Sequence, residues 1–476
     1  MPQVHREQVS YIVLIGIEME EKLDSLFHLK ERGTNVKTEF IAGLTTFVTV
    51  AYVLAVNPSV LADAGMDHGA VFTASCLICI IGSLLMAFLT NFPFLLVPSM
   101  GLNAYFTYTI VIGMGYSWQV SLAAVIIEGV VFAIISLTKL RDLLADAIPF
   151  GLKKAITAGI GLFITIIGLK GSGLLQPNES TYVSMISFNG TVQEGTFSTL
   201  GICALLALAG IVITAVLMAK NVKGNILIGI VATWVLGMIC EVCGLYVPNP
   251  DAGFYTLFPS FANGLAIPSL APVAFQADFS QFATVGFIAV VIAILFASIF
   301  DTLGTLIGTA TKAGLADADG NIPGIGKGLI AEAVTTICAG FIGSSPTCVA
   351  VESNAGVAEG GRTGLTAVFG ALMFAIALFL SPIFLAIPSF ATAPALVIVG
   401  FLMIGACCAV DWDDPTEGVP AFITLAAMPF FYSIAEGVFL GIISYTLINA
   451  LAGRGKKVSP LLWVLTVLFI IKYFFI

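Results

Sequence analysis

Acidic side chains stand inside apolar stretches of this sequence, where they could carry a proton or bind a polar ligand. They are Glu128, Asp301, Glu332, Glu352 and Glu436. An acidic residue at the centre of a membrane helix costs about 2.5–3.5 kcal/mol on insertion scales, so each needs a partner or a function. Asp301 ends the apolar run 290–300, and Glu352 follows a break in another apolar segment. We expect these two to act on a ligand or a proton, and the other three to serve packing.

Two polar stretches interrupt the apolar pattern in a similar way. Residues 94–106 (FLLVPSMGLNAYF) break at Pro98, and residues 343–356 (GSSPTCVAVESNAG) break at Pro346. Irregular backbone at membrane depth is tolerated only where protein buries it or where it lines a cavity. The two breaks should therefore meet at one central site. That site would hold Asn103, whose amide both donates and accepts, and Glu352 at the start of a half-helix.

The composition indicates what kind of protein positions these groups. Of the 476 residues, 58% are hydrophobic and only 10% are charged. Soluble proteins have about 25% charged residues, so most of this apolar surface must face lipid or other helices. We therefore exclude a soluble enzyme, a nucleic-acid binder and a disordered scaffold, and we take the lipid bilayer to be the chain's surroundings.

Hydropathy predicts fourteen segments, with boundaries that are accurate to a few residues. They are residues 39–56, 70–89, 101–113, 117–137, 151–169, 200–218, 224–245, 282–302, 328–341, 353–358, 363–380, 393–407, 419–432 and 435–451. A spanning helix needs about 20 residues, so the third and tenth segments are too short to cross alone. Each is the third segment of its half. Seven segments per half make the halves inverted relative to each other, which is a transporter design.

Basic residues predict the orientation. With fourteen segments and a cytoplasmic N-terminus, every Lys and Arg except Lys170 falls on the cytoplasmic side. This asymmetry is typical of membrane proteins, and we expect the chain in the inner (plasma) membrane. The apolar tail 461–475 is predicted to be an interfacial helix rather than a fifteenth span. Because Met19 would make a natural start, we expect the residues before it to be a dispensable extension.

Six motifs follow one another along the chain. They are FIAGLTTFVTVAY (40–52), MGLNAYF (100–106), FDTLGTL (300–306), VESNAGV (351–357), GGRTGLTA (360–367) and DWDDP (411–415). Together they resemble the adenine/guanine/hypoxanthine permeases, a branch of the nucleobase–cation symporters in the nucleobase–ascorbate transporter superfamily. The resemblance extends from about residue 20 to the C-terminus.

The resemblance implies an all-α polytopic membrane protein with about fourteen transmembrane segments in a 7+7 inverted repeat. Two short strands are implied at the broken third and tenth segments. The core domain would comprise residues 39–138 (segments 1–4) and 282–384 (segments 8–11), and the gate domain 139–246 (segments 5–7) and 385–452 (segments 12–14). Residues 1–38 would form a cytosolic N-terminal segment, 247–281 an extracellular or periplasmic loop, and 453–476 a C-terminal tail.

The resemblance also implies import of purine nucleobases by proton symport, with an elevator-like movement of the core. Its site residues correspond to Asp301, Glu352 and Asn103, and we add Ser99, Thr347 and Tyr105 as substrate-binding candidates, with Tyr105 as a ring that could stack on the base. Asp301 and Glu352 are the candidates for proton coupling. A carboxylate can accept two N–H bonds, as guanine offers, whereas a protonated carboxyl offers one donor and one acceptor, as adenine requires.

The chain departs from the family pattern at two motifs. It has VPSMG (97–101) where the family has APGMG, and ESNAG (352–356) where the family has ESAAG. Ser99 and Asn354 therefore add polar groups near the site. The choice between adenine and guanine or hypoxanthine, and between proton and sodium coupling, remains open.

Other functions fit the sequence less well. A transporter of the same fold could carry another cargo, such as an inorganic anion, uracil or xanthine, but acids rather than bases stand at the breaks, which disfavours an anion. The sequence is also compatible with a receptor or a channel. A membrane-embedded enzyme would need a nucleophile–base pair or a metal set, and the sequence has no P-loop, HExxH or GxSxG motif. We expect no enzyme, metal site or cofactor, and the family implies a homodimer formed through the gate domain.

Overall fold

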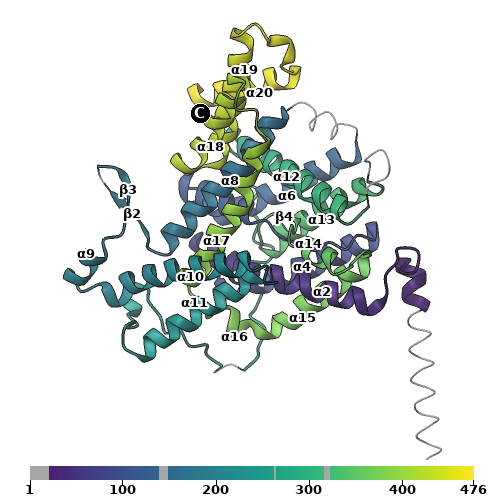
Figure 1. Ribbon diagram of the computed structural model, residues 1–476. Coiled ribbons are helices and arrows are strands. Elements are labelled where there is room, and N and C mark those ends of the chain that lie inside the picture. Colours follow the sequence, from purple (N-terminus) through teal and green to yellow (C-terminus); the bar gives the residue numbers. More distant parts are fainter. Residues whose placement is uncertain (1–20, 139–147, 179, 262–263, 316–321, 476) are drawn as a thin grey trace, which may run out of the picture.

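The computed structural model describes residues 21–138, 148–178, 180–261, 264–315 and 322–475, and most of these lie in helices (Figure 1). Within these ranges, nine helical segments are long and apolar enough to cross a bilayer, and three shorter apolar helices accompany them. The extension predicted before Met19 lies outside the described residues.

The described elements follow one another along the chain, with η1 and η2 as π-helices and the other η elements as 3-10 helices. They are α2 (Val36–Val50), α3 (Val53–Asp63), α4 (His68–Thr90), β1 (Leu96–Pro98), α5 (Met100–Ala104), η1 (Tyr105–Gly113), α6 (Trp118–Leu137), α8 (Phe150–Gly171), β2 (Leu175–Asn178), β3 (Tyr182–Met185), α9 (Phe188–Gln193), η2 (Phe197–Gly201), α10 (Ile202–Ala219), α11 (Asn225–Val242), η3 (Pro250–Ala252), α12 (Val285–Lys312), α13 (Ile325–Ile342), β4 (Thr347–Val349), α14 (Ser353–Ala358), α15 (Gly364–Ala377), η4 (Leu378–Leu380), α16 (Ser381–Phe384), α17 (Ser389–Ile404), η5 (Gly405–Ala409), α18 (Pro415–Phe430), α19 (Ile434–Leu451), η6 (Gly455–Lys457) and α20 (Pro460–Phe475).

Two elements differ from their predicted bounds. The predicted segment 39–56 is two helices, α2 and α3, because the chain turns at Ala51 and Tyr52. The predicted segment 282–302 continues as α12 to Lys312, so Asp301 lies well inside the helix rather than at its end. Threonines after Asp301 lower the hydropathy there. Their hydroxyls nevertheless bond back to carbonyls of the same helix, as the 2.9 Å bond from Thr305 Oγ1 to the Asp301 carbonyl shows, so these polar groups are satisfied inside the helix.

Elements from both halves of the sequence pack into a first helix group, which we define as α2–α6, η1, α12–α15 and the β1–β4 pair. Within it α4 packs on α13 and α15, α6 on α13 and α12, and α2 on α14 and α15. Glycines allow these close contacts. A Cβ at Gly82 of α4 would lie 2.7 Å from Thr335 Cγ2 and 2.8 Å from Leu96 Cβ, so only glycine lets α4 reach both α13 and β1 here.

The second helix group comprises α8, α10, α11, α17, α18 and α19. Here α8 packs on α17 and α18, α18 on α19, and α10 on α11 and α17. Figure 1 shows α17, from the second half of the chain, beside α8, from the first half. As in the first group, each bundle is therefore assembled from segments far apart in the sequence.

Between described residues, two contacts that involve a lysine join the groups. In one, Lys170 Nζ of α8 lies 4.9 Å from the ring centroid of Tyr432, whose ring makes an edge contact with Tyr108 of η1 at 5.9 Å. The Tyr108 hydroxyl donates to Asp63 at 2.6 Å, so a continuous set of side chains crosses from α8 to α3. Lys170, the one basic residue that the predicted topology places on the non-cytoplasmic side, thus takes part in a contact between the two helix groups. In the second contact, Lys223 before α11 forms an ion pair with Glu359 after α14.

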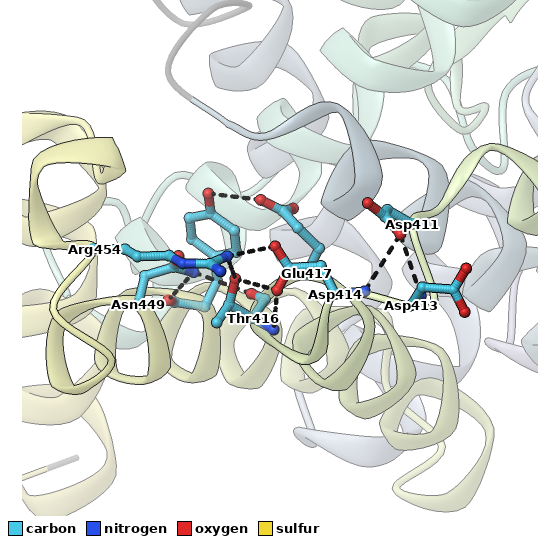
Figure 2. A network of polar contacts seen from close by, with 8 residues as sticks. Asp411, Asp413, Asp414, Thr416, Glu417, Asn449 and Arg454 are labelled. Carbon is cyan, nitrogen blue, oxygen red and sulfur yellow. Dashed lines mark hydrogen bonds and ion pairs between the residues drawn. The ribbon is translucent and has the colours of Figure 1, made fainter.

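A polar network fixes the start of α18 against the end of α19 (Figure 2). Asp414 caps α18 by accepting bonds from the Thr416 amide at 3.0 Å and its hydroxyl at 2.8 Å, and it pairs with Arg454. Asn449 donates to the Thr416 carbonyl at 3.0 Å. These bonds and the Arg454 charge lower the pKa of Asp414 to about 2. The network stabilises the ionised carboxylate and holds the two helices in register.

Candidate functional site

The two broken segments meet at a short antiparallel pair of strands. β1 pairs with β4 so that Leu96, Val97 and Pro98 lie opposite Val349, Cys348 and Thr347. The pairing continues at both ends, because the Ser99 amide donates to the Pro346 carbonyl and the Ala350 amide to the Leu95 carbonyl, both at 2.9 Å. Proline cannot continue a helix, and here the strand pairing supplies the backbone bonds that the broken helices lack.

Asp301 lies beside this strand pair. Its Oδ2 accepts a hydrogen bond from the Ser99 hydroxyl at 3.1 Å, which joins α12 to the first break. The Cys348 thiol of β4 lies next to the same carboxyl. Asp301 is partly exposed, whereas Ser99 is 2% exposed. One carboxyl oxygen is thus oriented by a buried hydroxyl, and the residue as a whole is not fully buried.

Glu352 lies at the second break, directly before α14. Its Oε1 accepts a hydrogen bond from the Tyr52 hydroxyl at 2.9 Å. Tyr52 is 3% exposed and stands at the turn between α2 and α3. Like Asp301, Glu352 is partly exposed and has one hydroxyl donor. The turn at residues 51 and 52 therefore has a defined role, because it presents a phenol to this carboxyl.

Asp301 and Glu352 lie on elements that pack together, because α12 contacts both β4 and α14, and Glu352 directly precedes α14. Among the described residues, neither forms an ion pair with a base. Two partly exposed acids with one hydroxyl donor each have free acceptor positions. This arrangement can accept N–H donors from a neutral polar ligand, or bind a proton, and it is poorly suited to an anion. Within the described ranges, no three His, Cys, Asp or Glu side chains gather as a metal ion requires.

Asn103 lies in a separate buried network. It is fully buried, and its Nδ2 donates to Asn57 Oδ1 at 3.1 Å, while its Oδ1 has no partner. Asn57 also donates to Ser75 at 2.8 Å and accepts from Ser345 at 3.1 Å. This network joins α3, α4 and α5 to the segment before β4. Asn103 thus holds the two breaks together through Asn57, and its unpartnered oxygen remains available as an acceptor.

Thr347 and Tyr105 are also buried, at 1% exposure each. The Thr347 hydroxyl lies 3.1 Å from that of Thr336 on α13. Because successive strand residues point to opposite faces, it is Cys348 that lies beside Asp301. The Tyr105 hydroxyl, in the first turn of η1, has no hydrogen-bond partner.

Sequence reasoning missed three residues of this region: Tyr52, Asn57 and Cys348. Tyr52 ends the first of the six motifs, and its polar tip in an apolar run was a usable signal. Asn57 was visible as a lone amide in the apolar run 53–61. Cys348 carried no such signal, because its importance depends on which face of the strand points toward Asp301.

Known permeases are similar to this protein over most of the chain. The model of a family described as "Permease family" matches residues 37–438. A putative permease of Methanocaldococcus jannaschii is 42% identical, covering 95% of this chain and 98% of that protein. The guanine/hypoxanthine permease PbuO of Bacillus subtilis is 41% identical, covering 94% and 100%. The adenine permease AdeP of Escherichia coli is 38% identical, covering 95% and 96%.

Solved structures share the fold at low sequence identity. The transmembrane domain of the cyanobacterial bicarbonate transporter BicA has a TM-score of 0.58 at 16% identity, covering 85% of this chain and 97% of that one. The murine anion transporter Slc26a9, in an inward-facing state, has a TM-score of 0.58 at 14% identity, covering 87% and 68%. The family match and the identities to its members, together with the apolar helices, lead to one conclusion: the chain belongs to the permease family and is an integral membrane transporter rather than an enzyme.

Proposed function

We propose that this protein imports purine nucleobases, with the base bound between Asp301 and Glu352 at the strand pair. The observation that carries the proposal is the pair of partly exposed carboxyls, each held by one hydroxyl, in a chain similar to permeases named for adenine and for guanine/hypoxanthine. A purine is neutral and presents N–H donors and ring-nitrogen acceptors along one edge. Acidic side chains with free acceptor positions match the donors.

Glu352 is assigned to the purine edge and Asp301 to the coupling proton. Asn103, Ser99, Thr347 and Tyr105 complete the proposed site: Ser99 orients Asp301, Asn103 holds the two breaks together through Asn57, Thr347 ties β4 to α13, and Tyr105 supplies a ring. The protonation state of Glu352 would then help select the base, since the ionised form suits guanine and the protonated form suits adenine.

The architecture behind this proposal is a 7+7 inverted repeat of fourteen segments, with the strands at segments 3 and 10. We assign the first helix group to the core domain (39–138 and 282–384) and the second to the gate domain (139–246 and 385–452). The packing of each group from both halves of the chain supports this division. The core would move past the gate in an elevator-like step. The chain would lie in the plasma membrane with a cytoplasmic N-terminus and would form homodimers through the gate.

The rival cargo on the same fold is an inorganic anion. The structural neighbours that carry anions are 14–16% identical, a level at which the likeness extends to the fold alone. At the strand pair, the two acids have no lysine or arginine partner among the described residues. This arrangement favours a neutral purine over an anion.

Uptake of labelled adenine, guanine and hypoxanthine tests the proposal, in cells that lack their own purine permeases and with or without a protonophore. We expect accumulation that unlabelled purine competes away and that the protonophore abolishes. Glu352→Gln should abolish uptake or change which base is taken up, whereas Glu194→Gln on an exposed surface should not. Absence of purine accumulation by the wild type, or unaltered uptake and base preference in Glu352→Gln, would contradict the proposal.

A further inference from the structure

Among the residues that the structure describes, four buried oxygen atoms on α6, α12 and α13 have no hydrogen-bond partner. They are both carboxyl oxygens of Glu128, the hydroxyl of Ser298 and Oε2 of Glu332. Glu128 and Glu332 are 0% exposed and Ser298 is 3% exposed. The Ser298 hydroxyl lies beside Glu128, and α6, which carries Glu128, packs on α13, which carries Glu332. Buried polar atoms almost always have partners, so this concentration of free acceptors indicates a bound species.

The cluster is adjacent to the proposed purine site. Thr302 follows Asp301 on α12, and its hydroxyl lies within hydrogen-bond reach of both Glu332 Oε1 and the Ser298 carbonyl. The Asp301 charge also acts on Glu332. One helix therefore presents Asp301 to the strand pair and Ser298 and Thr302 to the two glutamates. A change of charge at the glutamates would be felt directly at Asp301.

Within the described ranges, the surrounding helices bring no basic side chain to this pair of acids. Glu128 is the only charged residue of α6, and α4 has none after His68. On α12 and α13, the bases Lys312 and Lys327 are exposed. Lys312 stands about 16 Å along the helix from Asp301, at 1.5 Å per residue. The thiol of Cys348 on β4 is the other titratable group that acts on Glu332, and it carries no positive charge.

Close helix contacts separate the cluster from the surroundings. A Cβ at Gly129, the neighbour of Glu128, would lie 2.8 Å from Ile337 Cγ1 and 3.1 Å from the Ala333 carbonyl. α6 and α13 therefore touch along their backbones at this level. Burying an ionised carboxylate without a partner costs several kcal/mol, so the balancing positive charge must be a cation bound inside.

We propose that Glu128 and Glu332, with the hydroxyls of Ser298 and Thr302, form a second, buried cation site of this transporter. Its ligand is a small monovalent cation, either a proton or a sodium ion, since both satisfy carboxylate and hydroxyl oxygens. The proposal rests on the proposed function as a cation-coupled purine permease. It adds a site behind Asp301, and occupancy of that site sets the charge that Asp301 meets.

Transport by the reconstituted protein is the first test. With one proton coupled to each purine, an inward gradient of one pH unit should drive about tenfold accumulation. Because the second site sets the charge that Asp301 meets, Glu128→Gln should uncouple Asp301: the accumulation ratio should fall from about ten to about one, and uptake should no longer depend on external pH. An inward sodium gradient of about tenfold at equal pH is the second arm, because only sodium coupling would respond to it. Glu194→Gln, exposed and remote, should behave as the wild type.

Infrared spectroscopy of the purified protein tests the site without transport. A buried protonated glutamate gives a carboxylic-acid C=O band, which Glu128→Gln or Glu332→Gln should reduce and which deuterium oxide should shift. If sodium is the ligand, the band should appear when sodium is replaced by choline. Ser298→Ala, which removes a hydroxyl but no carboxyl, should retain the band and shift it.

Each result decides the matter. Loss of the band and of gradient-driven accumulation in Glu128→Gln supports the site. A wild type with no band or sodium response, or a Glu128→Gln protein with unchanged coupling, overturns it and leaves an ordinary buried polar cluster with bound water. If Glu128→Gln fails to fold, the wild-type spectra and Glu332→Gln still give the answer. A wild type that takes up no purine but retains the band would refute the proposed function while keeping the cation site.

Discussion

Replacing Tyr52 by phenylalanine tests whether Glu352 works because it is held in place. The substitution removes only the hydroxyl, whose bond to Glu352 Oε1 is 2.9 Å long. The ring is 3% exposed and stays packed. A hydrogen bond to a charged group contributes about 1.5–3 kcal/mol, and each 1.4 kcal/mol is about a factor of ten. We therefore expect the KM for purine uptake to rise by about tenfold or more, with an upper limit near 150-fold.

The chain offers a matched control in Tyr445→Phe. Tyr445 also donates its hydroxyl to a glutamate, Glu417, at 3.2 Å, but it belongs to the second helix group. Initial rates of labelled purine uptake should give a KM within about twofold of the wild type for this control. Thermal unfolding of both variants in detergent would measure the loss of stability that they share.

Two results would refute the reasoning about Tyr52. An unchanged KM in Tyr52→Phe would mean that the hydroxyl does not position a group that binds purine. An equal rise in KM in both variants would mean that loss of stability, rather than loss of orientation, causes the effect.

Three other substitutions test helix packing and helix caps by thermal unfolding in detergent. Gly82→Ala should lower the free energy of unfolding by about 1–3 kcal/mol through overpacking, whereas Gly171→Ala, with open space around it, should not; equal stabilities would contradict the packing account. Glu39→Gln should cost about 1.5–3 kcal/mol, because this buried carboxylate accepts bonds from three backbone amides at the start of α15; a neutral outcome would show that an amide replaces it. Asp414 has its pKa lowered to about 2 from 3.8, so its stabilisation is present above pH 3.8 and is lost as pH falls through about 2. Asp414→Asn should therefore remove part of the acid destabilisation, and identical unfolding curves between those pH values would argue against the Asp414–Arg454 contribution.

The positions of the breaks could be predicted because proline has no amide hydrogen and ends a helix locally. The end of α12 could not be predicted from hydropathy, since its threonines satisfy their own hydroxyls within the helix. The register of the strand pair could not be predicted either. Whether Thr347 or Cys348 faces Asp301 depends on pairing with residues some 250 positions earlier in the chain.

The sequence predicted that buried acidic side chains are energetically costly, but it did not predict that two of them lie near each other. Glu128 and Glu332 were expected to serve packing, because a single acid inside a membrane segment can be a helix cap, an ion-pair partner of a loop base or a side chain that reaches the interface. Their proximity arises from the contact of α6 with α13, which a single sequence does not encode locally. The same holds for Asn103, whose partner Asn57 lies on another helix.

The two contacts between the helix groups differ in their sensitivity to dissolved salt. Lys223 is 58% exposed in its pair with Glu359, and mobile ions screen such a pair strongly. The aromatic contact of Lys170 with Tyr432 and Tyr108 relies on ring packing, which ions barely weaken. In the predicted topology these contacts lie on opposite membrane faces. A higher ionic strength on the Lys223 face would thus favour separation of the two helix groups on that face first. The salt concentration on one side of the membrane would then influence on which side the transporter opens.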